Sequence, residues 1–338
     1  MDFILPKYHE PDFSDPVFAS SPDVKEAPAP SDGVAPEGYH STSMYPEYFK
    51  VAGKWTLAEE SRMDSSVVIR EDGHLDVVEN RNLKKGDRVV LGRTERAEEG
   101  IFLYSGGFSD PSEEASDDQF VFRQGRSRET SYARDYDRLI GLLEYERTHG
   151  KVVWVMGPAF AFDAGARRAM AALIDNGYCD ALLAGNALAT HDLEGALLHT
   201  ALGQDIYTQQ SMPNGHYHHL DVCNKVRACG SIPAFIERYG LDDGIICACV
   251  RNDVPFVLGG SIRDDGPLPE VIGNVYEAQN AMRNVLKDKT VRPVYLYAVD
   301  ADEFVVNKLL DRGSLAATTM VTNVQDFIRI VSEGLLKK

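Results

Sequence analysis

The chain has 338 residues, a formal net charge of −17 and 43% hydrophobic residues, which is enough for two domains with separate cores. The negative charge argues against nucleic-acid partners, which need a basic face, and against docking on anionic membranes. It leaves open a small cationic substrate such as a diamino acid, because an acidic protein attracts cations.

The start of the chain and its cysteines indicate a cytoplasmic protein. Residues 1–6 lack the basic and apolar regions of a signal peptide, and no apolar run is long enough to cross a bilayer. The five cysteines form an odd set without a secretion signal, which is typical of reduced thiols. Cys247 and Cys249 are too closely spaced for usual zinc ligands and lie in an apolar segment, so we predict buried strand residues and no metal site.

The amino-terminal third divides into two parts. Residues 1–37 are rich in proline, with serine and acidic residues between, so we predict an extended arm that buries too little surface to order itself. In residues 38–106 the β-branched runs Val67–Ile69 and Val89–Leu91 are separated by turn signals. This pattern predicts a small, mostly β module, with Trp55 in its core.

The rest of the chain is predicted to be α/β. Residues 107–150 combine an acidic linker with a helix from about Ser131 to Thr148. Residues 151–338 alternate apolar strands with helices, which predicts a Rossmann-like parallel sheet covered on both faces. In chain order we expect strand 151–156, helix 164–176, strand 181–184, a helical stretch to about 200, helices 220–229 and 233–239, strands 244–248 and 255–258, helix 271–286, strand 294–298 and two final helices.

Ligand-type residues follow four of these predicted strands. Three strands end in glycine, at Gly157, at Gly185 and at the pair Gly259–Gly260, and the carboxyl ends of strands form the ligand crevice of open α/β sheets. Asp300 follows a fourth strand, where nicotinamide-cofactor enzymes hold a ribose hydroxyl. Because the full Gly-x-Gly-x-x-Gly pattern is absent, a helix N-cap is an equally good interpretation of Asp300.

Charged and histidine side chains gather in two further stretches. The loop after Gly260 carries Arg263, Asp264 and Asp265, which predicts either a pocket loop or a charged turn. His191 and His219 lie near acidic residues, but the histidines lack the spacing that aligns metal ligands on one helix face. Their usual pKa near neutrality suits substrate orientation or proton transfer.

Several long motifs identify a family resemblance. They are Leu182–Glu194, Gly215–Leu220, Val254–Pro269 and Asp311–Ser314, with shorter matches at Gly53–Trp55, Met63–Asp64 and Lys85–Asp87. Together they resemble the LOR/SDH conserved-region family, which includes the archaeal and cyanobacterial-type ornithine cyclodeaminases. The likeness covers most of the chain from about residue 36 onward.

This resemblance implies a function and a site. It implies that the α/β domain binds NAD, which is recycled within one turnover while ornithine is oxidised, cyclised with loss of ammonia and reduced to proline. It also implies a small amino-acid substrate and a homo-oligomer. By matching motif, Asn186, Ala187, Asp264, Asp300, Gly313 and Ser314 would bind the cofactor, Asp265, His191 and His219 would be catalytic, and Arg263 and Asn224 would bind substrate.

The chain departs from the family pattern at two places. Phe160–Asp163 stands where relatives usually carry a histidine and small residues, and Lys287–Pro293 bridges directly where they carry an extra strand and a cofactor-contacting loop. Two alternatives therefore stay open. One is an enzyme that acts on another small amino acid or amide without net redox, and the other is a non-catalytic ligand-binding protein.

Overall fold

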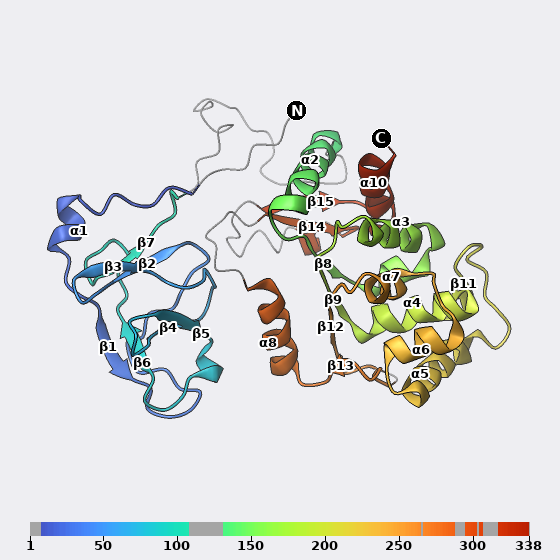
Figure 1. Ribbon diagram of the computed structural model, residues 1–338, viewed down its shortest axis with the longest axis horizontal. Helices are drawn as coiled ribbons and strands as arrows, with labels where there is room; N and C mark the ends of the chain where they lie inside the picture. The colour runs from blue at the N-terminus through green and yellow to red at the C-terminus, as the bar shows by residue number, and fades with distance from the viewer. Residues whose placement is uncertain are drawn as a thin grey trace.

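The computed structural model describes residues 8–107, 131–264, 266–287, 295–302, 304–306 and 317–337. Figure 1 shows a β-rich body, drawn in blue, beside a larger α/β body, with helix α8 (Val275–Leu286) between them. This arrangement confirms the predicted fold class, a β module followed by a Rossmann-like parallel-sheet domain.

The β module consists of two antiparallel sheets with one core between them. Phe49, Val67, Val77 and Ile101 have no exposed surface and belong to the same apolar cluster, as expected for alternating β-branched runs. The sheets have the orders β1-β6-β4-β5 and β3-β2-β7. Their strands are β1 (Lys25–Pro28), β2 (Glu47–Val51), β3 (Lys54–Leu57), β4 (Ser66–Ile69), β5 (Leu75–Val78), β6 (Arg88–Leu91) and β7 (Ile101–Leu103).

In the described part of residues 1–37, the arm is ordered by packing across the β module and not by itself. This segment forms the short helix α1 (Pro16–Ser20) and strand β1, which pairs with β6 from Lys25 opposite Leu91 to Pro28 opposite Arg88. Ala29 is 2% exposed and belongs to a second apolar cluster of the module, with Val68 and Val89. Composition counts apolar side chains, whereas strand β6 offers unpaired backbone groups along its edge that order even a polar partner.

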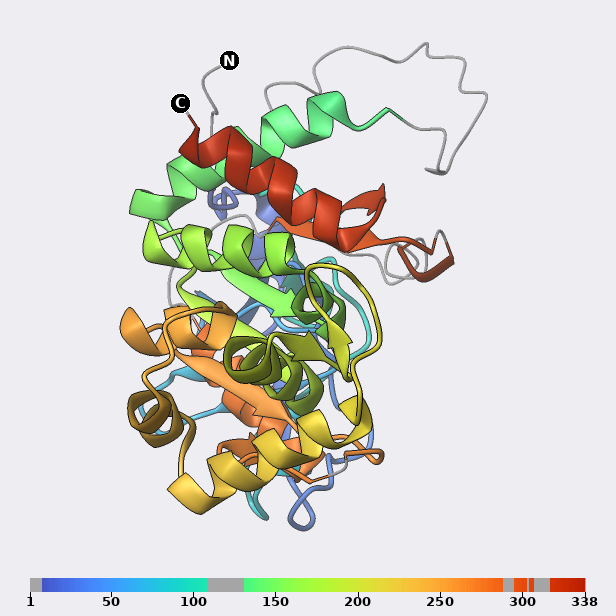
Figure 2. The same cartoon turned by 90° about the vertical axis from the view of Figure 1, so that its right-hand side faces the viewer.

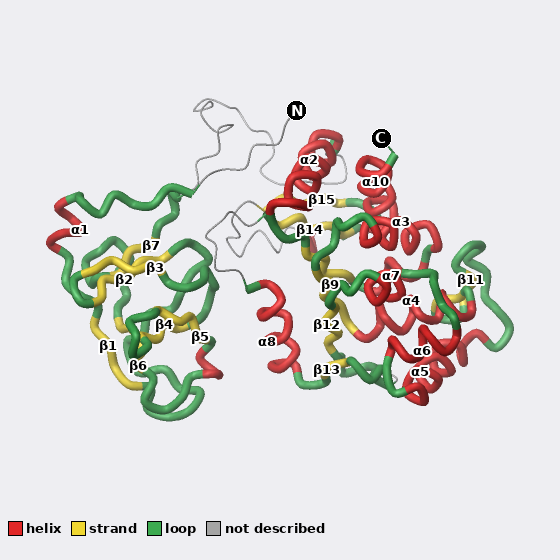
Figure 3. Tube along the Cα trace, in the orientation of Figure 1, coloured by secondary structure: helices red, strands yellow, loops and turns green. Residues whose placement is uncertain are grey.

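The α/β domain is built on a parallel sheet of order β13-β12-β9-β8. Helices α3 to α7 cover one face, and α8 lies on the other (Figures 1 and 3). Figure 2, turned to face the first of these layers, shows its helices in front of the strands. The strands are β8 (Val153–Met156), β9 (Ala181–Gly185), β12 (Phe256–Gly259) and β13 (Val271–Ile272), and the helices are α3 (Ala164–Asp175), α4 (Asn186–Leu198), α5 (His218–Cys229), α6 (Ile232–Tyr239) and α7 (Ile245–Arg251).

The remaining elements lie around this core. The predicted helix after the linker is confirmed as α2 (Ala133–His149), whereas linker residues 108–130 lie outside the described residues. A second parallel pair, separate from the main sheet, is formed by β14 (Leu296–Asp300) and β15 (Ala317–Val321), which α10 (Val324–Leu336) follows. Short elements are η1 (Asn80–Asn82), η2 (Pro158–Phe162), β10 (Thr200–Ala201), β11 (Gln204–Asp205) and η3 (Gly215–Tyr217).

One predicted element is wrong. Residues 244–248 were expected as a strand, but the chain there enters helix α7, in which Cys247 and Cys249 are buried. A short run that is apolar on every side fits a buried helix as well as a strand, so its periodicity does not distinguish them. The predicted helix 271–286 is confirmed as α8, but its first residues form strand β13. Of the two final helices, α10 is confirmed and residues 304–306 are helical, and strand β15, which was not predicted, lies between them.

Candidate functional site

The carboxyl ends of three parallel strands meet at one edge of the main sheet, and all three carry glycine. Gly185 is exposed although the rest of β9 is buried. A Cβ added to Gly157 would meet no atom within 4 Å, and one added to Gly185 would meet Gly259 O at 3.7 Å. The edge therefore leaves open backbone that a ligand can approach closely.

Helix α4 begins at this edge, directly after β9. Its N-cap is Gly185, which provides no side-chain cap, so the first backbone N–H groups of the helix are available to an anion. Ala187, in the first turn, is half-buried. A glycine-lined edge with an uncapped helix N-terminus fits the phosphates of a dinucleotide.

Asn186 holds the neighbouring loop in place. It is 5% exposed, its Oδ1 accepts a hydrogen bond from Leu268 N at 3.1 Å, and its Nδ2 donates to Gly266 O at 3.4 Å. Both polar ends of the side chain are thus bonded to the loop that follows β12. Asn186 therefore builds one wall of the crevice, and its implied contact with the cofactor stays a prediction.

The loop after Gly260 folds on itself. Asp264 accepts from Ser261 N at 2.8 Å and from the Ser261 hydroxyl at 3.0 Å, and Ser261 Oγ accepts from Arg263 N at 3.2 Å. Asp264 is half-buried, whereas the Arg263 side chain is exposed. Asp265 lies outside the described residues. Asp264 therefore ties the loop back to Ser261, whose hydroxyl forms an ST-type turn with Arg263.

Asp300 stands at the end of β14. Its Oδ1 accepts a hydrogen bond from Asp302 N at 2.8 Å, and Asp302 in turn accepts from Phe304 N at 2.8 Å. The first contact is an Asx turn at Asp300, whereas Asp302 occupies the capping position before the helical residues 304–306, so both interpretations of Asp300 stay predictions. The other two implied cofactor residues, Gly313 and Ser314, lie outside the described residues.

The structure brings His191 and His219 together. His191, on α4, is 8% exposed, and its ring centroid lies 6.0 Å from that of His219 on α5 and 5.3 Å from that of Phe162 in η2. Phe162 belongs to the stretch that departs from the family pattern. An imidazole pair beside an apolar ring can hold and transfer protons away from bulk water.

Glu194 is a site residue that the sequence did not reveal. It is fully buried, and its carboxylate accepts from His191 Nδ1 at 3.0 Å, Thr200 Oγ1 at 2.8 Å, Leu202 N at 3.0 Å and Gly203 N at 2.9 Å. Burial alone would raise its pKa, but hydrogen bonds led by that from His191 outweigh burial and hold the pKa below its usual value. The available signal was an acid three residues after a histidine on one helix.

Asp192, the remaining acid of the same motif, is structural. It has no exposed surface and accepts from Arg167 Nε at 2.8 Å, from Ile245 N at 3.1 Å and from Ile246 N at 2.8 Å. Arg167 is 1% exposed and also donates to Asp243. Asp192 therefore caps α7 and fastens it to α3 and α4.

Asn224 lies apart from the paired histidines. It is exposed on α5, whereas Val222, Cys223 and Val226 are buried. Five positions separate it from His219, which on an α-helix is a rotation of about 140°. Its position gives no support to the substrate contact that the resemblance implies.

Within the described residues, no three histidine, cysteine, aspartate or glutamate side chains gather as metal ligands. A search of the same residues for a helix able to cross a membrane finds none.

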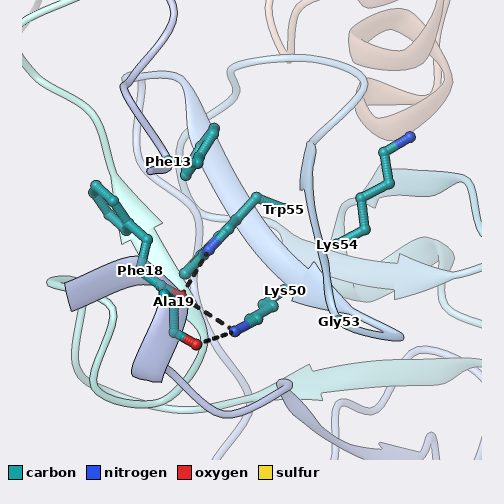
Figure 4. A pocket seen from close by; sticks show the side chains of 7 residues that line it. All are labelled: Phe13, Phe18, Ala19, Lys50, Gly53, Lys54 and Trp55. Carbon is teal, nitrogen blue, oxygen red and sulfur yellow. Dashed lines mark hydrogen bonds between the residues drawn. The ribbon is translucent and has the colours of Figure 1, made fainter. Parts of the chain in front are cut away.

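A cavity of about 440 Å³ lies in the β module, under helix α1 (Figure 4). Lys50 Nζ donates to Phe18 O, Ala19 O and Ser21 O, and Trp55 Nε1 also donates to Phe18 O. These polar groups are used to hold the end of α1, so the cavity anchors the helix and offers a ligand few free donors. It is lined by Phe13, Phe18, Ala19, Lys50, Gly53, Lys54 and Trp55.

Comparisons of the sequence point to one group of proteins. The family described as arginine dihydrolase ArgZ-like, C-terminal, Rossmann fold matches residues 140–331. An ornithine cyclodeaminase of Methanocaldococcus jannaschii is 38% identical over 350 residues, which cover 94% of this chain and 80% of that protein. The bifunctional arginine dihydrolase/ornithine cyclodeaminase AgrE of Nostoc is 33% identical, with 93% of this chain and 47% of AgrE covered.

Comparisons of the structure agree with this result. A LOR/SDH protein of Methanococcus maripaludis has a TM-score of 0.83 at 31% identity, and the match covers 94% of this chain and 99% of that one. The ternary complex of AgrE with ornithine and NAD+ has a TM-score of 0.57 at 31% identity, and the match covers 94% of this chain and 46% of that one.

Proposed function

Because this chain belongs to the family of the archaeal ornithine cyclodeaminases and ArgZ-like Rossmann domains, we propose that it converts ornithine to proline with release of ammonia. The observation that carries the proposal is the pair His191 and His219, which lies among the elements that follow the glycine-ended strands. The binding of ornithine and NAD+ by the neighbour AgrE supports the choice of substrate and cofactor.

NAD, when bound, supplies the reversible removal of the hydrogen on the substrate Cα. The backbone at Gly157, Gly185 and Gly259 would receive it, with its phosphates at the N-terminus of α4 near Ala187. Asp264, on the loop that follows β12, and Asp300, at the end of β14 in the separate parallel pair, are further proposed contacts. Gly313 and Ser314 are proposed on the family motif alone.

The protein's own residues bind the diamino acid and move its protons. Ornithine carries two ammonium groups, and each must lose a proton before its nitrogen can react. His191 and His219 would accept these protons through the ring nitrogen that carries a lone pair. Asp265 would pair with a substrate ammonium and Arg263 with its carboxylate, both charge-assisted contacts. We further propose that the enzyme is a cytoplasmic homo-oligomer, which light scattering of the purified protein would test.

The proposal is tested with purified protein, L-ornithine and NAD+, by measuring proline and ammonia and by titrating NAD+ calorimetrically. We expect equal amounts of both products, and only with NAD+ present or already bound. Ammonia release that is independent of NAD would instead support the alternative without net redox. Neither NAD binding nor ammonia release would contradict the proposal and leave a non-catalytic ligand-binding protein.

Two variants on helix α5 test whether His219 takes part in the reaction. His219→Ala should lower kcat by roughly 10²-fold or more, the usual contribution of general acid–base catalysis. Asp221→Asn changes an exposed residue two positions away on α5 and should retain activity. Equal activity in the two variants would remove His219 from the proposed mechanism.

A further inference from the structure

We propose that Glu194 is a positioning residue that sets the tautomer of two histidines, His191 directly and His218 through the Thr200 hydroxyl. In both rings Nδ1 would carry the hydrogen, which leaves Nε2 as the atom that accepts a proton. The role assigned to His191 rests on the proposed function, whereas the tautomers themselves do not. His218 thereby joins the site as a residue of the same kind.

The first link is direct. His191 Nδ1 lies 3.0 Å from Glu194 Oε2, and Leu202 N donates to the same oxygen at 3.0 Å. An ionised carboxylate only accepts hydrogen bonds, so Nδ1 must be the donor. A neutral imidazole has one N–H, and therefore Nε2 of His191 carries the lone pair.

The second link passes through a hydroxyl. Thr200 Oγ1 lies 2.8 Å from Glu194 Oε1 and 2.8 Å from His218 Nδ1. A hydroxyl has one hydrogen, which it gives to the carboxylate because a carboxylate cannot donate. The Thr200 oxygen must then accept from His218 Nδ1. One buried anion thus fixes the same tautomer in two rings on different elements.

Glu194 anchors these rings and does not carry protons between them. Four hydrogen bonds satisfy its carboxylate, and its pKa is held below the usual value, against the effect of burial and led by the bond from His191. It therefore stays ionised while His191 gains and loses a proton, and its charge favours the imidazolium form.

The other groups that face His191 do not replace this anion. His219 approaches from α5 and would repel an imidazolium when it is itself protonated, and Phe162 approaches from η2 as an apolar ring. Asp192, the next residue on α4, is paired with Arg167 and bonded to the start of α7.

The substitution Glu194→Gln tests the inference because it replaces one of the two carboxylate oxygens, Oε1 beside Thr200 or Oε2 beside His191, with an NH2 group. The glutamine amide nitrogen must occupy the position of one of these oxygens, where it donates a hydrogen bond and cannot accept one. Next to His191 it would force Nδ1 to accept. Next to Thr200 it would turn the hydroxyl toward His218 and force that Nδ1 to accept. Either way, one of the two rings must move its hydrogen to Nε2.

The experiment is ¹⁵N NMR of histidine-labelled protein without substrate, with signals assigned through His191→Gln and His218→Gln. In the wild type we expect both neutral rings as the Nδ1–H tautomer. In Glu194→Gln one of them should switch, and in Thr200→Val only His218 should be released. A wild-type His191 found as the Nε2–H tautomer, or no switch in Glu194→Gln, would overturn the proposal, whatever the activity.

A kinetic measurement tests whether Glu194 acts on the proposed reaction through His191. Loss of the anion should free the His191 ring to change its tautomer, so kcat in Glu194→Gln should fall about tenfold or more while KM changes little. A purely structural role would lower the amount of folded enzyme and leave kcat per folded molecule unchanged. If ornithine is not the substrate, the NMR result still decides the tautomers.

Discussion

Asn186 shows how much of a residue's role its motif can predict. The family motif pointed to the ligand crevice, and Asn186 does stand at the start of α4, beside exposed Gly185. Its amide, however, is bonded to Leu268 N and Gly266 O. Sequence assigns a residue to a site through its motif, but the partners lie about 80 residues away along the chain, and local spacing carries no information about them.

Replacing this amide should loosen the crevice wall. Asn186→Ala removes both bonds and leaves a buried backbone N–H without its acceptor, so we expect a loss of about 1–3 kcal/mol in the free energy of unfolding and weaker NAD binding. Urea denaturation and calorimetry measure the two effects. Asn176→Ala, whose side chain bonds only to the preceding turn of α3, is the matched control. Equal losses in both variants would contradict the assigned role.

Burial should control the reactivity of the individual cysteine thiols. Burial raises the pKa of Cys179 and of Cys247 to about 12, and Cys223 and Cys249 are also buried. Because the thiolate is the reactive form, we expect the native protein at pH 8 to react with a thiol reagent at Cys229, the partly exposed one. All five should react in guanidinium chloride. Fast labelling of Cys247 in the native state would contradict this burial.

Glu194 should also make stability depend on pH. Its pKa in the folded protein is below the ordinary value of 4.5, so the stabilisation is complete above that value and is lost as the pH falls through the lower folded pKa. Melting temperatures of the wild type should therefore fall more steeply from pH 5 to pH 3 than those of Glu194→Gln. Parallel curves would show that the carboxylate does not contribute as proposed.

At the scale of elements, sequence periodicity located most of the α/β domain. Strands that end in glycine and the long amphipathic helices were predicted close to their observed bounds. It failed at α7, which is apolar all round and begins at Gly244 in a backbone conformation with φ of 107°. The contacts that fix α7 come from Arg167 and Asp192 on two other helices, and no local pattern encodes them.

Two glycines of this region provide a matched test. A Cβ on Gly244 would lie 2.3 Å from Arg167 Nη2 and 2.8 Å from Asp192 Oδ2, whereas one on Gly240 (φ of 63°) would meet no atom within 4 Å. Gly240→Ala should cost about 1–2 kcal/mol for its left-handed backbone alone. Gly244→Ala should cost distinctly more, because it also displaces the buried ion pair. Equal losses in denaturant titrations would rule out the steric argument.

At the scale of the molecule, helix α8 joins the two bodies. Arg283 donates to Val77 O at 2.8 Å and contacts Glu60, and the Arg81 guanidinium lies 5.1 Å from the Tyr276 ring. These partners are about two hundred residues apart in the chain. The sequence therefore predicted both bodies but not the contact that sets one against the other.

The contacts between α8 and the β module should make the two bodies unfold together. Arg283→Met removes the donor to Val77 O and leaves Glu60 without its cation, so we expect a single calorimetric transition in the wild type to separate into two. Arg88→Met, which breaks an exposed pair with Glu26 inside the β module, should leave one transition. One transition in both variants would show that the modules are coupled by other contacts.

The central claim is that one molecule of NAD removes a hydrogen from ornithine and returns it within a single turnover. Mass spectrometry of the product from [2-²H, α-¹⁵N]ornithine tests it most directly. The account predicts proline that keeps deuterium at C2 and contains no ¹⁵N, together with ¹⁵N-labelled ammonia. Loss of the deuterium to solvent, or ¹⁵N retained in proline, would contradict it.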